Sequence, residues 1–421
     1  MRTTRVAHHD EWLHQVSSLS SLFSTVLLTP LFGASPTRRR LWPVDNLCLA
    51  VIGIAAGCEL HLGELRRRDF RQSVLVLTAA VTACSWLFIF PAVLLMGPHI
   101  GFLTHAPRTR LLSVASLTAT LGVARSPASM IAVLREMEAR GPFSTLVMSI
   151  TVVKDVVVLI LFSINVEIVN AMEASAQQTG KLAHLLARCI AAPVFKVLLS
   201  AILGLAGGLI LSAMLMQQRM RDRGLLPFGV LLLSASMFLG ARVLPTEPLL
   251  VCVAAGALAS NRREDRGGDR QREELHGVLR PLMPWINLLF FTLAGAALAV
   301  DALADTAPIA AVIHAVRLVS LVVATTVGGY GTGLPVAHRR VLWMAMVTQA
   351  GVALGLARTV LARFPDWGGD LYTCLVSTIV LNQAVGPPLF RAALLAVGEH
   401  KQAHLAPASP RAAPADGETD A

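Results

Sequence analysis

The chain has 421 residues, of which 54% are hydrophobic and only 15% are charged, and its mean hydropathy is +0.63. A soluble domain carries about 25% charged residues, so these figures exclude a set of soluble domains and also a disordered or collagen-like chain. The formal charge of +10 would suggest nucleic acid in a soluble protein. Aromatic residues, on which bases could stack, make up only 5%, however. The arginines lie in short loops beside apolar runs, as is typical of membrane proteins. We therefore expect a lipid bilayer, and no nucleic acid, as the partner.

Apolar runs near the length that crosses a bilayer, about 20 residues, extend through most of the chain. Broken by charge, glycine and proline, they predict twelve membrane spans, numbered in order: about 17–34, 45–64, 73–97, 111–134, 143–167, 188–214, 225–244, 247–260, 281–300, 307–331, 340–362 and 371–396. The fold class is therefore an all-α polytopic membrane protein with about 12 transmembrane helices. We divide the chain into an N-terminal segment, 1–44, with one weak or partial span, a transmembrane domain, 45–397, and a disordered cytoplasmic tail, 398–421.

Loop charge predicts the orientation of the spans. Every second loop is basic, beginning with the one after span two, and the most charged is the loop of residues 262–280. Because basic loops stay in the cytoplasm, both ends of a twelve-span chain are predicted to be cytoplasmic. The basic residues at 38–40 and 108–110 depart from this pattern. The six cysteines lie in apolar stretches without CxxC spacing, so we expect neither a metal site nor a cofactor.

Several spans carry ionisable residues, which are costly inside a membrane unless they face protein or a water-filled cavity. Span two contains Glu59, span five contains Lys154 and Asp155 in its middle, and span ten contains His314 and Arg317. Adjacent residues of a helix point about 100° apart, so Lys154 and Asp155 each need a partner on another helix. A buried ion pair with only a packing role is the alternative. These positions are the first candidates for a functional site.

Two spans contain signals of a broken helix. Span four reads Arg125-Ser126-Pro127, and proline has no amide hydrogen to bond the carbonyl four residues earlier. Span eleven carries Gln349, Gly351 and Gly355. Its glycines predict a second break, although close packing through a G-x-x-x-G pattern would account for them equally.

The two breaks belong to two similar halves of the chain. Asp155 follows Pro127 by 155 − 127 = 28 residues, and Asn382 follows Gly351 by 382 − 351 = 31. Spans three to five therefore resemble spans ten to twelve, which lie seven spans later and are upside down. Inverted repeats with two crossing broken helices are typical of secondary transporters that bind their substrate near the bilayer midplane.

The residues of these spans resemble the sodium/hydrogen exchanger family of monovalent cation:proton antiporters. The resemblance covers roughly residues 44–395, and the segments that carry it are Leu49–Leu60, Ala124–Pro127, Val153–Asp155, Asn287–Gly295, Gln349–Ala357 and Gly386–Phe390. It implies an elevator-type homodimer with a core bundle of about 73–167 and 307–396. The family's ion-binding carboxylate maps onto Asp155, its basic residue before the second break onto Arg317, and its acid outside the core onto Glu59. This chain departs from the family at Lys154, where a carboxylate or asparagine is usual, and the resemblance leads us to expect a further helix before span one that we do not recognise in residues 1–16.

The resemblance and the buried charges together predict a secondary active transporter, not an enzyme, that exchanges H+ for Na+ or K+. Asp155 would hold either a proton or a cation. The other candidate residues for binding ions or protons are Lys154, Ser126, Arg125, Arg317, Glu59 and Gln349, with helix breaks at Pro127, Gly351 and Gly355. Two alternatives remain open. Three of the five central charges are basic, which favours a proton-coupled anion or organic-acid transporter, and the departures from the family favour a truncated or inactive paralogue.

Overall fold

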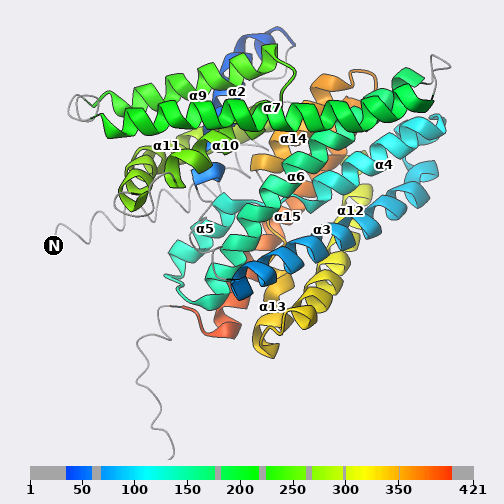
Figure 1. The fold of residues 1–421 in the computed structure, drawn as a ribbon. Coiled ribbons are helices and arrows are strands. Elements are labelled where there is room, and N and C mark those ends of the chain that lie inside the picture. Colours follow the sequence, from blue (N-terminus) through cyan, green and yellow to red (C-terminus); the bar gives the residue numbers. More distant parts are fainter. Residues whose placement is uncertain are drawn as a thin grey trace, which may run out of the picture.

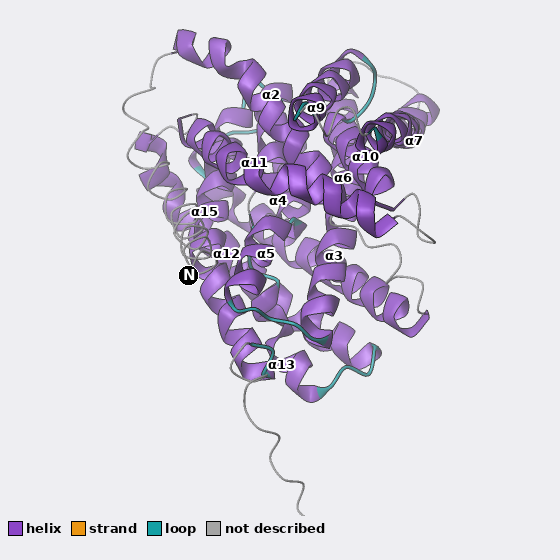
Figure 2. Ribbon diagram, turned by 90° about the vertical axis from the view of Figure 1, so that its left-hand side faces the viewer, coloured by secondary structure: helices purple, strands orange, loops and turns teal. Residues whose placement is uncertain are grey.

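The structure is a computed structural model of the chain, and it describes residues 35–58, 68–175, 182–217, 224–261, 268–296, 300–349 and 351–400. These residues form thirteen α-helices and no strand (Figure 2): α2 (Ser35–Cys58), α3 (Arg68–Met96), α4 (Arg108–Val123), α5 (Pro127–Glu136), α6 (Pro142–Ser175), α7 (Leu182–Met216), α9 (Leu226–Val243), α10 (Pro248–Asn261), α11 (Gly268–Ala296), α12 (Val300–Gly331), α13 (Val336–Ala345), α14 (Gly351–Arg363) and α15 (Gly368–Val397). Two short 3-10 turns, η3 (Gly97–His99) and η4 (Gly101–Leu103), follow α3.

The helices follow the predicted spans closely. Six of them are long and apolar enough to cross a membrane, and 43–58 and 248–261 form shorter apolar helices. Spans three to eight and ten to twelve each fall on one helix or on one pair of helices, and spans two and nine follow α2 and α11 up to residues 58 and 296, where the described residues stop. The first span lies outside the described residues, so the total of twelve stays a prediction.

The charged loop predicted for 262–280 is shorter than expected, because α11 begins at Gly268. Leu275, Val278 and Leu279 are buried, and their spacing of three and four residues places them on one face of a helix. An amphipathic helix therefore replaces most of the predicted loop. The charges of this helix that suggested a loop lie at 269–274, before these apolar positions, and at Arg280, after them.

We describe the helices in two groups, the predicted core bundle and the remaining helices, which are also joined by contact between α6 and α7. In the group that we call the scaffold, α10 packs against α7 and α2, and α2 packs against α9 and α11. In the core bundle, formed by α3 to α6 and α12 to α15, α3 packs along α12 and α4, and α15 packs against α12, α13 and α14. Figure 1 shows α7 and α9 on one side of the molecule and α3, α12 and α13 on the other, with α6, α14 and α15 between them.

Glycines bring the scaffold helices close together. A Cβ added at Gly57 on α2 would overlap the carbonyl oxygen of Val253 on α10, and one at Gly256 on α10 would overlap the carbonyl oxygen of Ile54. On the other side of α10, a Cβ at Gly208 of α7 would lie 2.8 Å from the carbonyl oxygen of Ala255. Contact between helix backbones is the usual role of small residues in membrane helices. α10 is thus the central helix of the scaffold, with α2 packed closely on one side and α7 on the other.

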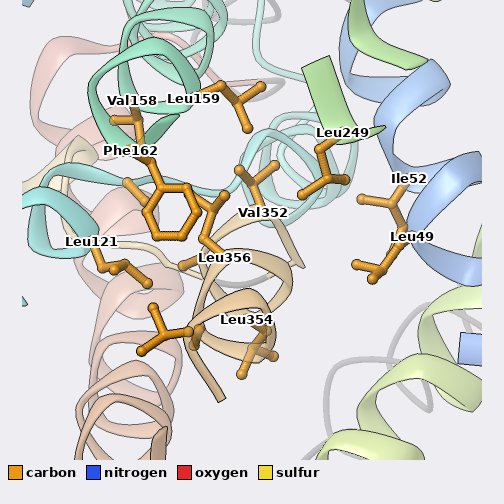
Figure 3. Close-up of a cluster of buried hydrophobic side chains, with 14 of the residues drawn as sticks. Leu49, Ile52, Leu121, Val158, Leu159, Phe162, Leu249, Val352, Leu354 and Leu356 are labelled. Carbon is orange, nitrogen blue, oxygen red and sulfur yellow. The ribbon is translucent and has the colours of Figure 1, made fainter. Parts of the chain in front are cut away.

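The core bundle meets the scaffold through an apolar layer. Figure 3 shows Val352 and Leu356 of α14 beside Phe162 of α6, with Leu249 of α10 and Leu49 of α2 on the facing side, and all five residues belong to one buried cluster. Two ion pairs also join the groups: Lys196 on α7 with Glu167 on α6, and Arg358 on α14 with Asp45 on α2.

Candidate functional site

The two predicted helix breaks are present and touch each other. Span four ends its first helix at Val123 and resumes at Pro127, while span eleven ends at Ala345 and resumes at Gly351. The backbone amide of Ser126 donates a hydrogen bond of 3.2 Å to the carbonyl of Thr348. The non-helical segments of the inverted halves therefore cross in direct contact.

Pro127 and Gly351 are the first residues of α5 and α14, a position where proline's missing amide hydrogen costs nothing. Gly355, which was also predicted to belong to the second break, is instead inside α14. A Cβ at Gly355 would lie 2.8 Å from Cδ2 of Leu49 on α2. Gly355 therefore serves helix packing, and its assignment to the break is corrected.

Arg317 on α12 binds the carboxyl-terminal ends of both broken helices. Its side chain is fully buried. Nε donates to the carbonyl of Gly122 at 2.7 Å and Nη1 to that of Val347 at 2.7 Å, and longer bonds of 3.2 and 3.4 Å reach Ala124 and Met346. The free carbonyls at a helix end carry about half a negative charge. The guanidinium thus neutralises α4 and α13 together and holds them at the crossing.

Asn382 on α15 links the polar side chains on this side of the crossing. Asn382 accepts a hydrogen bond of 2.9 Å from Nη1 of Arg317 and donates one of 2.9 Å to Oε1 of Gln349. Gln349 in turn donates to the carbonyl of Leu121 at 2.7 Å. Nδ1 of His314 lies 2.8 Å from Oδ1 of Asn382, to which it donates in the tautomer that carries its hydrogen on Nδ1. Gln349 and Arg317 were predicted site residues, whereas Asn382 was recognised only as a repeat position.

The middle of α6 lies close to the first break, since Lys154 and Asp155 are buried there together with Arg125. Neither carboxylate oxygen of Asp155 has a hydrogen-bond partner among the described residues, and the same holds for Nζ of Lys154 and for Nε and Nη2 of Arg125. Nη1 of Arg125 makes only long contacts of 3.4 Å, to the carbonyl of Val147 and to Sδ of Met130. Lys154 and Arg125 are the cations that act most strongly on Asp155. A buried carboxylate without a short hydrogen bond among the described residues is therefore close to two cations with free donors, and the backbone amide of Arg125 also acts on it.

Ser126 links the first break to α15. Its hydroxyl accepts hydrogen bonds from the amide and the hydroxyl of Ser129, at 3.3 and 3.0 Å, and Nε2 of Gln383 donates to the Ser129 hydroxyl at 2.9 Å. Glu59, the remaining predicted site residue, lies outside the described residues. The described residues contain no group of three or more His, Cys, Asp or Glu side chains that could hold a metal ion.

Comparison with known proteins gives the family. The model of the family described as sodium/hydrogen exchanger, transmembrane, matches residues 46–396. The chain belongs to the sodium/hydrogen exchanger family. Members of this family are multi-pass membrane proteins that carry out antiport. No protein among curated sequences matches the chain.

Solved exchanger structures share the fold. The structure of the sodium/proton antiporter MjNhaP1 from Methanocaldococcus jannaschii at pH 8 is similar to this chain with a TM-score of 0.65, at 14% sequence identity, over 95% of this chain and 99% of the other. An electron-microscopy structure of the same antiporter gives a TM-score of 0.62, at 13% identity, over 90% of this chain and 91% of the other. The predicted all-helical fold of crossing broken helices is thereby confirmed.

Proposed function

We propose that this sodium/hydrogen exchanger family member exchanges protons for Na+ or K+ at the carboxylate of Asp155. The observation that carries the proposal is the burial of this carboxylate at the crossing, where neither oxygen accepts a short hydrogen bond from the described residues and only the backbone amide of Arg125 acts on it as a donor. A carboxylate that a network of donors already satisfied would have little affinity left for a proton or a metal cation. An unsatisfied one in a medium of low dielectric constant has a high affinity for either.

Competition between the two ions follows from this arrangement. A proton bound to one oxygen removes the negative charge that a cation needs, so Asp155 holds one or the other. Each ion would be released on the side of the membrane to which the site is open. Arg317 takes no part in the exchange of ions in this scheme, because helix-end carbonyls occupy its donors. Its role would be to keep the crossing intact while the site changes sides.

A proton-coupled anion transporter is the second candidate, and one observation favours it. With Arg317 bound to the helix ends, Arg125 and Lys154 remain as two buried cations with free donors beside one carboxylate. An anion held between the two would use the donor nitrogens that Asp155 leaves free. The two candidates differ in which ion of a salt is needed for transport.

The test is the dissipation of an imposed pH gradient in proteoliposomes. Chloride salts of lithium, sodium and potassium are added in turn and then replaced by gluconate salts. We expect dissipation that depends on the cation and is equal in chloride and gluconate. A rate that follows the anion and ignores the cation would establish the second candidate instead.

Asp155→Asn supplies the control for the site, because it keeps the shape of the side chain and removes the charge. The matched variant is Asp69→Asn, the same change at an exposed carboxylate of α3. We expect the first to abolish exchange and the second to leave it intact. Exchange retained by folded Asp155→Asn would remove Asp155 from the proposal.

Two properties of the whole protein are also proposals. Loop charge supports a cytoplasmic carboxyl terminus, which the accessibility of a terminal tag in intact and in opened cells would test. The homodimer that the resemblance implies would be tested by the mass of the purified protein in nanodiscs.

A further inference from the structure

The amino-terminal end of α6 lacks a capping residue of its own. The helix begins at Pro142, after Gly141, with no acidic residue in its first turn. Pro142 has no amide hydrogen, and the amide of Thr145 already bonds the carbonyl of Gly141 at 3.1 Å. The two amides left to satisfy are those of Phe143 and Ser144, the ones that an N-cap side chain normally accepts from.

Glu399, 255 residues after Ser144, satisfies both. Its Oε1 accepts from the amide of Phe143 at 2.7 Å, and its Oε2 accepts from the amide of Ser144 at 2.8 Å and from the Ser144 hydroxyl at 2.7 Å. The side chain is buried. A carboxylate at this end of a helix is also favoured by the helix dipole. The end of α15 therefore supplies the cap that the sequence before α6 omits.

Two glycines make this contact possible. α15 ends at Val397, and its C-cap Gly398 adopts the left-handed conformation at φ 75°, while the amide of Glu399 bonds back to the carbonyl of Leu394 at 3.1 Å. This left-handed helix ending turns the chain so that Glu399 reaches α6. On the other side, a Cβ at Gly141 would overlap the Glu399 carboxyl group. An ordinary N-cap side chain at position 141 and the Glu399 cap therefore exclude each other.

The contact joins the two helices that carry equivalent positions of the inverted halves, Asp155 on α6 and Asn382 on α15. Asn382 is fixed at the crossing by its own hydrogen bonds. Asp155 has none among the described residues, so its height relative to the crossing depends on how α6 is held. Asp155 lies eleven residues from Ser144, about 17 Å along the helix at 1.5 Å per residue.

We propose that Glu399 is a positioning residue for ion exchange: by capping α6 from the end of α15, it fixes the height of Asp155 relative to the helix crossing. The inference rests on the proposed function, since it assigns to Glu399 an effect on ion binding at Asp155. A cap that only stabilised α6 could be replaced by one from the helix's own chain. A positioning contact could not, because a local cap would leave this end of α6 untied to α15. The opposite end of α6 is tied separately, by the hydrogen bond of 2.9 Å that Nε1 of Trp367, at the start of α15, donates to Glu173.

The experiment separates these two roles in full-length protein in proteoliposomes. Glu399→Ala removes the cap, and Gly141→Ala displaces the Glu399 carboxyl group while leaving it in the chain. The double variant Glu399→Ala/Gly141→Asp restores a local N-cap in the space that Glu399 vacates. Melting temperature and the apparent KM for the cation are measured for each.

We expect both single variants to raise the apparent KM about three- to tenfold. The double variant should recover the melting temperature but keep the raised KM. Recovery of both quantities in the double variant would reduce Glu399 to a structural cap and overturn the inference. An unchanged KM in folded Glu399→Ala or Gly141→Ala would overturn it as well.

A measurement without transport keeps this test apart from the test of the proposed function. Spin labels at positions 168 on α6 and 395 on α15, in a background without native cysteines, report the offset of the two helices. We expect Glu399→Ala to change their mean distance by about 1.5 Å, one residue's rise, and Gly141→Asp not to reverse it. If the parent protein exchanges no cation, the proposed function fails, and the positioning role is judged by the label distance alone. A label distance that stays the same in Glu399→Ala as in the parent protein would overturn the positioning role.

Discussion

Replacement of Arg317 by lysine tests whether the guanidinium geometry, beyond the positive charge, holds the crossing together. Arginine presents five donors in a planar fork, whereas lysine offers three from a single nitrogen. In the structure the fork reaches the carbonyls of Gly122 and Ala124 on one side and of Met346 and Val347 on the other. A lysine ammonium at one of these ends would leave the other without a donor.

The expected loss follows from the carbonyls left unpaired. Each buried carbonyl that loses its partner costs about 1–3 kcal/mol, so the two carbonyls at one helix end cost roughly 2–6 kcal/mol. One of the two bonds at each end is long, 3.2 Å to Ala124 or 3.4 Å to Met346, and therefore weak. We therefore expect the free energy of unfolding to fall by about 3 kcal/mol. At roughly 2 °C per kcal/mol for a large chain, we expect Arg317→Lys to melt about 6 °C below the parent protein.

The matched control is Arg391→Lys, the same change in an ion pair with Glu136 in which both side chains are more than half exposed. Exposed pairs contribute about 0–1 kcal/mol, so this variant should melt within about 2 °C of the parent. Thermal unfolding in detergent, followed by tryptophan fluorescence, measures both. Equal melting temperatures for the two variants would refute the reasoning, because the charge alone would then suffice at the crossing.

Three further predictions concern other parts of the molecule. Asp155→Asn should reduce exchange to the rate of empty liposomes while the protein still melts cooperatively; a melting curve without a transition would instead mean that the charge is needed for folding. If Lys154 stays protonated throughout the cycle, one proton exchanges for one cation, so a potential of about 100 mV should leave the rate unchanged in the parent and in Lys154→Gln alike. A steep dependence on potential in the parent that Lys154→Gln abolishes would contradict this electroneutral cycle. Gly256→Ala should destabilise the scaffold by about 1–3 kcal/mol, because the new methyl group would overlap the carbonyl of Ile54, whereas Gly240→Ala, with open space around its Cβ, should not lower the melting temperature.

Much of the fold could be predicted from the sequence because membrane helices leave a local signature. The apolar runs predicted spans two to twelve, and Pro127 and Gly351 marked where two of them break. Charges in apolar surroundings also pointed to Lys154, Asp155 and Arg317, since such residues are rare inside membranes. These inferences need only neighbours along the chain.

What the sequence did not reveal depends on contacts between distant segments. Nothing near Arg317 indicates that its donors reach carbonyls of two other helices, and nothing near Glu399 indicates that it caps α6. Asn382 gave one weak signal, its place in the second half of the repeat. Gly355 was assigned wrongly because a glycine at a helix break and a glycine at a helix contact look alike in a sequence, and only the position of Leu49 separates them.

The packing of α10 between α2 and α7 has a consequence for how the protein enters the membrane. At 14 residues and 1.5 Å per residue, α10 is about 21 Å long, against about 30 Å of hydrocarbon. A segment so short is a poor substrate for insertion alone, yet only four residues separate it from α9. We expect α9 and α10 to enter the bilayer together as one hairpin during synthesis, and α10 to be held there stably only once the glycine-lined faces of α2 and α7 enclose it.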